Sequence, residues 1–551
     1  MKTPVEQATL AFLQEQAPEL ADSFLEALPR AWRTTLENLL GAMFREKLIT
    51  GPSVPLPSGG RLAVGGATEH AFGRVIVSGQ VRVESSQGEK ELDHPLDVFE
   101  ALGGHWGVLP GEVAESVANL AMAYACVAGR GTQLPPNLPD IDNSILTLER
   151  MCAEGHNLHP CGRVRTGMSP EESYRYAAEC VGDVELRLMS VRADRMLVSG
   201  PMATFFPAPA GRVVLAVHPW QLAHAIPATY PEELASAIIV PLERTIRATS
   251  TTSMRSVVTP NGLVLKTALD VLLTSTRRNI SPATTYNGPR ISTILTRIVA
   301  SEPQLRQRVA VVRELAGVAF RSPGDHDHDR LRNLSMLIRE DPNRYVNPGD
   351  LAVTGCALFA SLHGRTVLEH LVGDPEDMLV EYAELLLPPV LRLLVKYGIA
   401  LEAHLQNTVV VFQGERPVRL LLRDFAGIRV SLDRLRSAGV DYRPHPDSIT
   451  TTSDLDEVRN KAFYAAVQAN LAEVVRGLNV PDERAWGLIW RVCKQTFASL
   501  AAEGFADAAN ADRSALCAPT LGQKAFLSMR LKPDCGDIYH QVPNPLHHVA
   551  S

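Results

Sequence analysis

The chain has 551 residues, 45% of them hydrophobic, which is enough for about three or four units of ordinary domain size. Its formal net charge of −7 argues against general nucleic-acid binding, because that function normally shows a basic surplus. The N-terminal sequence lacks the continuous apolar run of a signal peptide, and no stretch of about 18 apolar residues predicts a membrane span. The eight cysteines are scattered and form no CxxC pair, so we expect reduced thiols in a cytoplasmic protein without nucleic-acid or membrane partners.

Helix and strand patterns alternate along the chain without a regular βαβ rhythm, which predicts an α+β fold. Apolar residues recur at helical spacing over 5–49, and a second helical pattern covers 110–128. Strand-like sequence at 74–84 lies between them, and the proline-rich segment 133–140 cannot continue a helix. We therefore expect a mainly helical first domain over residues 1–140.

The remainder of the chain predicts two further domains. Residues 141–325 mix helical and strand patterns, and the polar segment 321–330 reads as a boundary loop. Beyond it, helical patterns surround a pair of strand-like runs at 402–430. We expect the third domain to cover residues 326–551.

The segment from Thr251 to Arg278 is the most informative in the sequence. Two strand-like runs flank Asn261-Gly262, and Asn-Gly is the strongest short-range signal for a β-hairpin. If these two residues form the loop, Val257 lies opposite Lys266 across the hairpin. Apolar residues such as Leu265 and Leu269 then point toward a core.

One face of this hairpin is expected to gather cations and hydroxyl groups, because side chains alternate between the faces of a strand. Arginine supplies a planar fork and lysine a point charge, a combination that suits polyphosphate. The alternative is an ordinary solvated strand face. The residues of matching parity, if the strand continues past Lys266, are Ser253, Arg255, Lys266, Thr274 and Arg278.

A second cluster lies between Glu154 and Gly167, where two histidines, two arginines and three glycines occur within fourteen residues. An anion-binding loop would use backbone N–H groups exposed by glycine together with the guanidinium groups. A zinc site is a second interpretation, although the spacing matches no common zinc module and the arginines would repel a cation. A structural loop with capping histidines is the third. The ligand types of the zinc interpretation are Cys152, His156, His159 and Cys161.

A third cluster begins at Glu402, where Glu402, His404 and Gln406 alternate with apolar residues and should share one face of a strand. A second run returns after a turn near Gly414, so Asp424 should lie within a residue or two of His404 and Gln406. Carboxylate, amide and imidazole groups on one face can hold Mg²⁺ and a carboxylate substrate. A polar network on a half-exposed sheet is the alternative.

Common nucleotide-binding loops are absent from the sequence. It contains no GxxxxGK[ST] segment and no GxGxxG segment, and the HExxH and GxSxG patterns are missing too. A nucleotide would therefore be held by side chains on strands rather than by a glycine-rich loop.

In their order along the chain, these segments resemble the signatures of the NRPS-independent siderophore synthetase family, the aerobactin-synthetase-like or IucA/IucC family. Arg163 stands where that family usually has lysine, and Ser256 stands where threonine is commoner. The first change keeps a charge and alters its geometry, whereas the second keeps the hydroxyl. The segments are GHNLHPCGRVRTG at 155–167, HPWQ at 218–221, SMRS with Lys266 and TSTRR, EAHLQN with RDFAG, KAFLSMRL at 524–531 and NPL at 544–546.

The resemblance implies a three-part, cupped-hand architecture: a helical thumb, mixed α/β fingers and a palm with an antiparallel sheet and helices, with ATP between fingers and palm. It implies that a carboxylic acid is activated as an acyl-adenylate and captured by an amine or alcohol, with Mg²⁺ as cofactor. A homodimer is implied as well. The two rival functions are a kinase-like phosphotransferase and a non-catalytic binder of carboxylate siderophores.

The resemblance also implies roles for individual residues. The catalytic set is Arg255, Lys266, Arg278 and His404. The nucleotide-binding set is His156, His159, Arg163, Arg165, Ser253, Arg255, Ser256, Lys266, Arg278, Gln406 and Asp424. The Mg²⁺ ligands are Glu402, Asn407 and Asp424, and the groups that orient the carboxylate are His404, Gln406 and Arg278.

Overall fold

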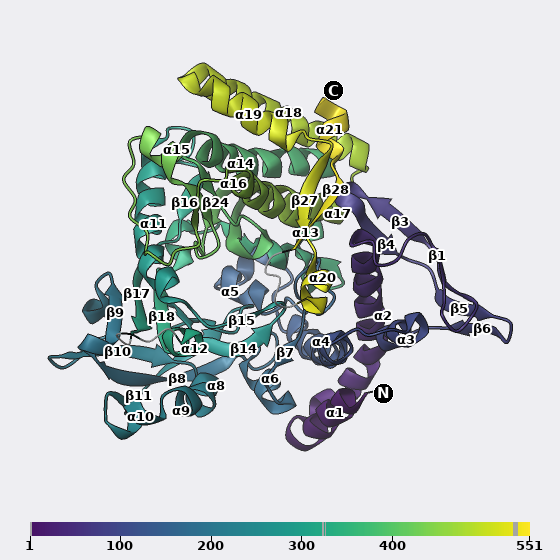
Figure 1. Ribbon diagram of the computed structural model, residues 1–551, viewed down its shortest axis with the longest axis horizontal. Coiled ribbons are helices and arrows are strands. Elements are labelled where there is room, and N and C mark those ends of the chain that lie inside the picture. Colours follow the sequence, from purple (N-terminus) through teal and green to yellow (C-terminus); the bar gives the residue numbers. More distant parts are fainter. Residues whose placement is uncertain (1–2, 322–323, 325–326, 533–537, 551) are drawn as a thin grey trace.

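A computed structural model describes residues 3–321, 324, 327–532 and 538–550. It confirms the predicted α+β class and agrees with a cupped-hand arrangement of three parts (Figure 1). The segment 321–330, interpreted as a boundary loop, lies partly outside the described residues.

The N-terminal part is mainly helical and also carries two small sheets. The apolar faces of α2 and α4 pack together, and the first sheet has the strand order β1-β2-β5-β6. Its helices are α1 (Pro4–Gln16), α2 (Ala21–Arg45), α3 (Pro95–Leu102) and α4 (Leu109–Gly131). Its strands are β1 (Ser53–Pro55), β2 (Arg61–Val64), β3 (Ala67–His70), β4 (Arg74–Val77), β5 (Val81–Ser85) and β6 (Gly88–Glu91).

The middle part is built on an eight-stranded sheet with the order β10-β8-β11-β12-β13-β18-β17-β9. One face of this sheet is apolar and forms its own core, which includes Val257, Leu265 and Ile338. The strands are β8 (Asp183–Arg192), β9 (Met196–Ser199), β10 (Arg212–Val217), β11 (Ile239–Ser250), β12 (Ser256–Val258), β13 (Val264–Thr267), β17 (Glu314–Phe320) and β18 (Ser335–Arg339). The helices beside it are α6 (Pro170–Tyr176), α7 (Met202–Phe205), α8 (Pro219–Ala223), α9 (Ala225–Thr229), α10 (Pro231–Ala235), α11 (Pro282–Ser301) and α12 (His328–Arg332). Helix α5 (Ser144–Glu149) packs instead on β19 (Leu351–Thr354) of the C-terminal sheet.

The hairpin around Asn261 forms, but its predicted register is wrong by one residue. Ser256, not Val257, lies opposite Lys266, because the connection is five residues long rather than two. In that loop the Thr259 hydroxyl donates to the Asn261 side chain and to the Leu263 carbonyl, which closes a wider turn than Asn-Gly alone would make. Lys266 consequently shares its sheet face with Ser256 and diagonally with Arg339 of β18.

The expectation that one strand continues from Lys266 to Arg278 is also wrong. The chain leaves the large sheet after Thr267 and enters a three-stranded sheet of order β15-β14-β7. Thr274 adopts a positive φ of 61°, so the chain reverses there and brings Arg278 opposite Leu269. The strands of this sheet are β7 (Arg165–Thr166), β14 (Leu269–Leu273) and β15 (Thr276–Arg278).

The C-terminal part contains a four-stranded sheet of order β16-β24-β23-β19. Its strands pair in antiparallel fashion except β16, which runs parallel to β24. The β23–β24 hairpin turns at Gly414, as predicted, with Gln413 opposite Arg416. The strands are β16 (Val309–Val311), β19 (Leu351–Thr354), β23 (Thr408–Gln413) and β24 (Arg416–Leu422).

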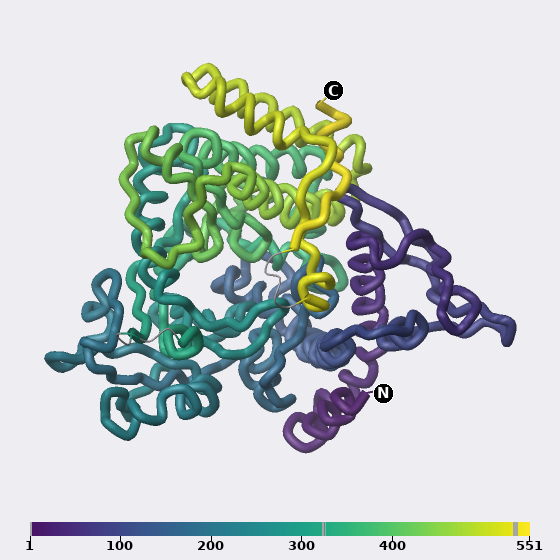
Figure 2. The backbone as a smooth tube through the Cα atoms, in the orientation of Figure 1, coloured from purple at the N-terminus to yellow at the C-terminus, as the bar shows by residue number. Residues whose placement is uncertain are grey.

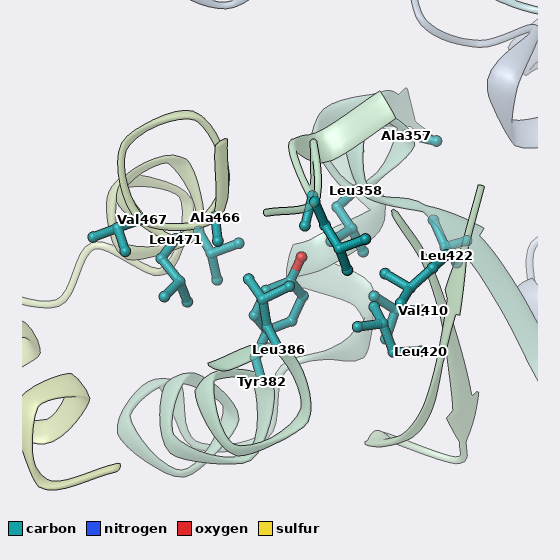
Figure 3. Close-up of a cluster of buried hydrophobic side chains, with 14 of the residues drawn as sticks. Ala357, Leu358, Tyr382, Leu386, Val410, Leu420, Leu422, Ala466, Val467 and Leu471 are labelled. Carbon is teal, nitrogen blue, oxygen red and sulfur yellow. The ribbon is translucent and has the colours of Figure 1, made fainter. Parts of the chain in front are cut away.

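Helix α14 and the π-helical segment η8 (Tyr464–Leu471) lie beside this sheet and bury its apolar face (Figure 3). Tyr382 of α14 lies in this core and donates its hydroxyl to Asn470 at 2.8 Å. The helices here are α13 (Val367–Leu371), α14 (Pro375–Tyr397), α15 (Leu432–Ser437), α16 (Leu455–Phe463), α17 (Ala472–Leu478), α18 (Asp482–Leu500), α19 (Ala506–Leu516), α20 (Phe526–Leu531) and α21 (Pro545–Ala550). The short strands are β20 (Ser361–Leu362), β21 (Arg365–Thr366), β22 (Ile399–Ala400), β25 (Arg429–Ser431), β26 (Thr451–Thr452), β27 (Thr520–Lys524) and β28 (Tyr539–Pro543).

The three parts are interleaved along the chain, so their sheets do not follow the boundary expected between residues 325 and 326. Strand β16 precedes that boundary and joins the C-terminal sheet, whereas β18 follows it and joins the eight-stranded sheet. Near the C-terminus, helix α20 returns to lie beside the N-terminal helix α2 (Figure 2). Each part therefore depends on chain from another part for its packing.

Glu46 fastens the C-terminal segment to the N-terminal part. It is buried and accepts hydrogen bonds from the Leu527 and Ser528 amides at 2.9 and 2.7 Å, at the start of α20. We predict that Glu46→Ala destabilises the protein by about 3 kcal/mol, because buried donors lose a charged acceptor. Thermal unfolding measures the effect. Glu15→Ala, at an exposed position of α1, should change the midpoint little, and equal midpoints for the two variants would contradict the assignment.

Candidate active site

A cavity of about 730 Å³ opens where the three parts meet. Nine lysine and arginine side chains line it, against four aspartate and glutamate side chains. The whole chain carries a net charge of −7, so this concentration of cations is local and does not follow from composition. A cavity of this size, lined mainly by positive side chains, suits an anionic ligand as large as a nucleotide.

Lys266 and Asp424 join the eight-stranded sheet to the C-terminal sheet across this cavity. The Lys266 ammonium lies 2.8 and 2.7 Å from the two carboxylate oxygens of Asp424. Lys266 is 1% exposed, and burial lowers its pKa although Asp424 opposes that change. Sequence reasoning gave these residues separate partners, a phosphate for Lys266 and Mg²⁺ for Asp424, whereas in the structure they bind each other.

Asp424 follows β24 in a left-handed conformation with φ of 64°, which turns its side chain toward the eight-stranded sheet. Arg339 lies 3.4 Å from its carboxylate and also pairs with buried Glu314 at 2.9 Å. Burial by itself would raise the pKa of Asp424, but the positive charges of Lys266 and Arg339 outweigh it and hold the pKa well below 3.8. Asp424 therefore carries a full negative charge at neutral pH.

Arg255 and Arg278 also line the cavity, and no described carboxylate forms an ion pair with either guanidinium. Arg255 donates to the carbonyls of Arg278 and Asn279 at 2.7 and 3.1 Å, and Arg278 donates to the Thr274 hydroxyl at 2.8 Å. Burial, together with the charge of the neighbouring Arg278, lowers the pKa of Arg255 to about 9. Asp424 lies near enough to raise the pKa of both arginines, but its carboxylate already pairs with Lys266 and Arg339. The remaining positive charge favours an anion shared between the two guanidiniums.

The turn that precedes β12 orients Arg255 and presents hydroxyl groups to the same cavity. Met254 adopts a positive φ of 58°, so Arg255 reaches the cavity by a turn and not by strand alternation. The Ser253 hydroxyl accepts from the Ser256 amide at 3.1 Å, which closes this turn. Ser253 and Ser256 both line the cavity, as expected.

The segment from Glu402 to Asn407 lines the opposite wall. It is an extended stretch followed by a short 3₁₀ turn, η7 (Leu405–Asn407), and not the strand that we expected. Buried and accessible side chains still alternate along this stretch. Ala403 and Leu405 are buried, whereas Glu402, His404 and Gln406 are accessible from the cavity. Asp424 lies close enough to raise the pKa of His404, as expected, although burial is the larger effect and lowers it.

Neighbouring side chains and burial determine the protonation states of Glu402 and His404 on this wall. Lys461 pairs with Glu402 at 2.9 Å, and although burial would raise the pKa of Glu402, Lys461 and His404 lower it to about 2. Asn407 donates toward the His404 Nε2 atom at 3.3 Å. Because burial lowers its pKa, His404 is neutral at pH 7, and a neutral imidazole can hydrogen-bond a carboxylate without adding charge.

Sequence reasoning missed the buried acid that assembles the cavity walls. Glu149, which is fully buried, accepts from Arg423 at 2.6 Å and from the Thr354 hydroxyl at 2.7 Å. Its other oxygen accepts from the Thr252 amide at 3.3 Å, and Thr252 in turn accepts from Gln406 at 3.1 Å. A glutamate in a helical sequence gives no local signal of such a role.

Sequence reasoning also missed Arg339, although its position within an apolar strand indicates a buried and paired side chain. It is the only charged residue within the buried strand β18, and an arginine is fully buried in such a run only when it is paired.

Arg163 and Arg165 are engaged by a buried carboxylate, which gives them a structural role. Both pair with Glu179, which is 2% exposed, and Arg163 also donates to the carbonyls of Cys152 and Glu154. Burial raises the pKa of Glu179, and the two guanidiniums more than reverse this. Both residues border the cavity, but they share the Glu179 carboxylate as a partner, and the phosphate contacts expected of them remain predictions.

The histidines of the same loop cap backbone groups. His156 accepts from the Leu158 amide and His159 from the Cys161 amide, each through Nδ1. His159 contacts the Ser275 hydroxyl at 2.8 Å and does not line the large cavity, whereas His156 does. The interpretation as capping histidines is therefore right for this geometry. Among the described residues, no group of three or more histidine, cysteine or acidic side chains could hold a metal ion, which contradicts the zinc interpretation.

Magnesium fits this cavity only as an ion that arrives with a polyphosphate. Mg²⁺ is usually held by one or two carboxylates together with phosphate oxygens and water, so a dedicated cluster of acids is not required. Asp424 and Glu402 both line the cavity and are ionised, and Asn407 adds an amide oxygen. These residue types fit such an ion, and their role as its ligands remains a prediction.

Two sequence-family profiles match successive parts of the chain. The profile of the IucA/IucC family matches residues 144–360, which include the Lys266 hairpin. A profile described as ferric iron reductase FhuF-like transporter matches residues 379–538, which include Glu402 and Asp424. In the described part of the chain, no helix combines the length and apolarity needed to cross a bilayer.

Curated relatives and solved structures match most or nearly all of the chain. A D-ornithine–citrate ligase of Staphylococcus aureus is 22% identical over 98% of this chain and 97% of its own length. Staphyloferrin A synthase of the same organism is 27% identical over 70% of this chain and 69% of its own. The petrobactin biosynthesis protein AsbB of Bacillus anthracis superimposes with a TM-score of 0.82 at 19% identity, covering 96% of this chain and 98% of that one.

ATP-bound aerobactin synthetase IucA of Klebsiella pneumoniae has the same fold, with a TM-score of 0.73 at 17% identity over 93% of this chain and 99% of that one. The fold of these structures and the matched profile point to the same family that the order of the sequence motifs resembles. The profile match over residues 144–360 and the curated relatives together support membership of the IucA/IucC family of NRPS-independent siderophore synthetases.

Asp424→Asn tests the ion pair that joins the two sheets. Asparagine tolerates the positive φ at this position, so the variant removes the charge and keeps the backbone. Because Lys266 and Arg339 lose their anion, we expect a loss of about 2–4 kcal/mol in unfolding free energy at pH 7.

The pH dependence of that loss gives a second test. The folded pKa of Asp424 is depressed, so its contribution is complete above its unfolded value and is lost only as the pH falls toward the folded pKa. The stability gap between wild type and variant should therefore stay constant from pH 8 to pH 5 in thermal unfolding. A gap that closes within this range would contradict the depressed pKa.

Proposed function

We propose that this protein is an ATP-dependent siderophore synthetase that adenylates a carboxylic acid, of the citrate type, and condenses it with an amine or alcohol. The observation that supports this most strongly is the pair of cavity-lining guanidiniums, Arg255 and Arg278, which have no described carboxylate partner and lie beside the Lys266–Asp424 ion pair. Such a cluster suits the phosphates of a nucleotide. The names of the relatives support the acid, because one is a D-ornithine–citrate ligase, and the ATP-bound structure of a relative supports the nucleotide.

The proposed reaction has two steps. A carboxylate oxygen of the acid attacks the α-phosphorus of ATP, the bond from that phosphorus to the pyrophosphate oxygen breaks, and an acyl-adenylate forms. The nucleophile then attacks the acyl carbon, AMP leaves, and the nucleophile loses a proton. No protein nucleophile is needed, so the work of the site is to position the reactants and stabilise charge.

In the first step, negative charge develops on the phosphate oxygens. Arg255, Arg278 and Lys266 are fixed by hydrogen bonds or burial, so they can stabilise that charge without reorganising. A phosphate would compete with Asp424 for Lys266 and would leave Asp424 available to Mg²⁺. When bound, Mg²⁺ would neutralise further phosphate charge.

The wall formed by His404 and Gln406 is proposed to orient the carboxylate. A neutral His404 donates one hydrogen bond, and the Gln406 amide, held by Thr252, offers a second polar group. Arg278 can contribute to both substrates because it lies near enough to lower the pKa of His404. Roles for Glu402 and Asn407 as Mg²⁺ ligands, a homodimeric assembly and a cytoplasmic location remain predictions.

The products of the reaction test this function. With ATP, Mg²⁺ and a panel of di- and tricarboxylic acids, we expect pyrophosphate release that depends on the acid, and AMP when a diamine, amino acid or amino alcohol is added. Release of ADP would instead indicate the kinase-like phosphotransferase. Binding of the acid without any nucleotide turnover would indicate the non-catalytic binder.

Two adjacent arginines on β15 form a matched pair for testing the phosphate cluster. Arg278 lines the cavity, whereas Arg277 is largely exposed and pairs with Asp270 at 3.1 Å. Arg278→Ala should lower kcat/KM for pyrophosphate release by about 10²–10³-fold, because one fixed charge at the transition state is removed. Arg277→Ala should stay within about twofold of wild type. Equal activities of the two variants would contradict the assignment of Arg278.

A further inference from the structure

The side chain and the backbone of Gln406 are held by two different neighbours. The side-chain amide nitrogen donates to the Thr252 hydroxyl at 3.1 Å, and the Arg423 guanidinium donates to the backbone carbonyl at 2.8 and 3.1 Å. Thr252 lies in the turn before β12, whereas Arg423 directly follows β24. Both neighbours donate to the fully buried carboxylate of Glu149, which therefore holds Gln406 by two routes.

In each of its described contacts the Glu149 carboxylate is the acceptor. Its Oε1 atom accepts from Arg423 at 2.6 Å and from the Thr354 hydroxyl at 2.7 Å. Its Oε2 atom accepts from the Thr252 amide at 3.3 Å and lies 3.4 Å from the Thr252 hydroxyl. A carboxylate that is paired with an arginine carries no proton, so the Thr252 hydroxyl supplies the proton of this last hydrogen bond.

The direction of that hydrogen bond determines which end of the Gln406 amide faces Thr252. A hydroxyl group has a single proton to donate, and the Thr252 proton points to Glu149. Thr252 can therefore only accept from Gln406, which requires the amide nitrogen to face it. The Gln406 Oε1 atom then points away from Thr252, and no described residue donates a hydrogen bond to it. Since Gln406 lines the large cavity, this oxygen is an acceptor available to a ligand.

An amide oxygen is a poor partner for a carboxylate, because both groups only accept hydrogen bonds. The donors for a carboxylate on this wall are the neutral His404 imidazole and the Arg278 guanidinium, both of which line the same cavity. The Gln406 oxygen suits a hydroxyl group instead. The wall as a whole therefore suits an acid that carries a hydroxyl group beside the carboxylate.

We propose that Glu149 is a positioning residue that turns the Gln406 amide oxygen toward the cavity, where this oxygen accepts a hydrogen bond from a hydroxyl group of the acid. The inference rests on the proposed function and narrows its substrate to a hydroxy acid. Glu149 itself does not line the cavity, so it touches no substrate and acts through Thr252 and Arg423.

Two pairs of acids that differ by one hydroxyl group supply the readout. Citrate is compared with tricarballylate, which is citrate without its hydroxyl, and malate is compared with succinate. For each acid, kcat/KM is measured from pyrophosphate release. In the wild type we expect the hydroxy acid to be preferred by about 10-fold or more in at least one pair, because the other acid leaves the Gln406 acceptor without a donor.

Thr252 and Thr354 give a matched pair of variants. Both hydroxyls contact the same carboxylate, but only that of Thr252 also contacts Gln406. Thr252→Val removes the group that orients the amide, so the preference for the hydroxy acid should fall to within about twofold. Thr354→Val removes a Glu149 contact of the same kind and should keep the preference, even where thermal unfolding shows that the variant is less stable.

Glu149→Gln tests the direction of the hydrogen bonds. Its oxygen can still accept from Arg423 and Thr354, which places the new amide nitrogen against Thr252. Thr252 would then accept from residue 149 and donate to Gln406, so the Gln406 nitrogen would replace the oxygen in the cavity. The preference for the hydroxy acid should be lost as in Thr252→Val, and Thr252→Val carries the test if Glu149→Gln does not fold.

Three results would overturn the inference and leave the proposed function intact, because acid-dependent pyrophosphate release would persist in each. They are equal kcat/KM for both members of each pair in the wild type, a preference that survives in Thr252→Val, and a preference that Thr354→Val abolishes as completely as Thr252→Val. Absence of pyrophosphate release with every acid would instead refute the proposed function, and the inference with it.

Discussion

The contact between Lys266 and Asp424 is the constraint around which the site is arranged. Lys266 lies on a strand of the eight-stranded sheet and Asp424 follows a strand of the C-terminal sheet, 158 residues away. Neither charge could remain buried alone, because removing an ion from water costs several kcal/mol unless a partner compensates it. The pair therefore requires the two sheets to meet at this point, and the cavity forms beside it.

Electrostatic imbalance distinguishes this cavity from the rest of the molecule. Most of its arginines are already satisfied by buried acids, such as Glu179 for Arg163 and Glu149 for Arg423. Arg255 and Arg278 are exceptions, since their described partners are carbonyl and hydroxyl oxygens. The arginines that hold the fold together can thus be separated from those available to a ligand by asking which of them have a carboxylate.

The loop at 154–163 has a double role in this arrangement. Its histidines cap its own backbone, and its carbonyls at Asn157 and Leu158 receive Arg74 and Arg45 from the N-terminal part. The loop is therefore held from both sides, by the middle part that carries Ser275 and by helix α2 and strand β4 of the N-terminal part. This explains why a segment so rich in ligand-type residues is chiefly structural in its observed contacts.

The sequence identified the elements of the site but not their exact relation in space. The hairpin at Asn261 and the turn at Gly414 were predictable because both follow from local turn chemistry. The register at Lys266 was missed by one residue, since the Thr259 hydroxyl widens the loop, and the reversal at Thr274 was missed because a threonine with positive φ leaves no sequence signal. Arg163 and Arg165 were predicted as phosphate ligands because the sequence shows their charges and not the buried Glu179.

By itself, therefore, the sequence indicated the α+β class, the resemblance to one family and many of the residues that gather at the cavity, because these depend on local patterns and their order along the chain. Only the tertiary structure decided which charges are neutralised, since ion pairs such as Lys266 with Asp424 join segments far apart in sequence.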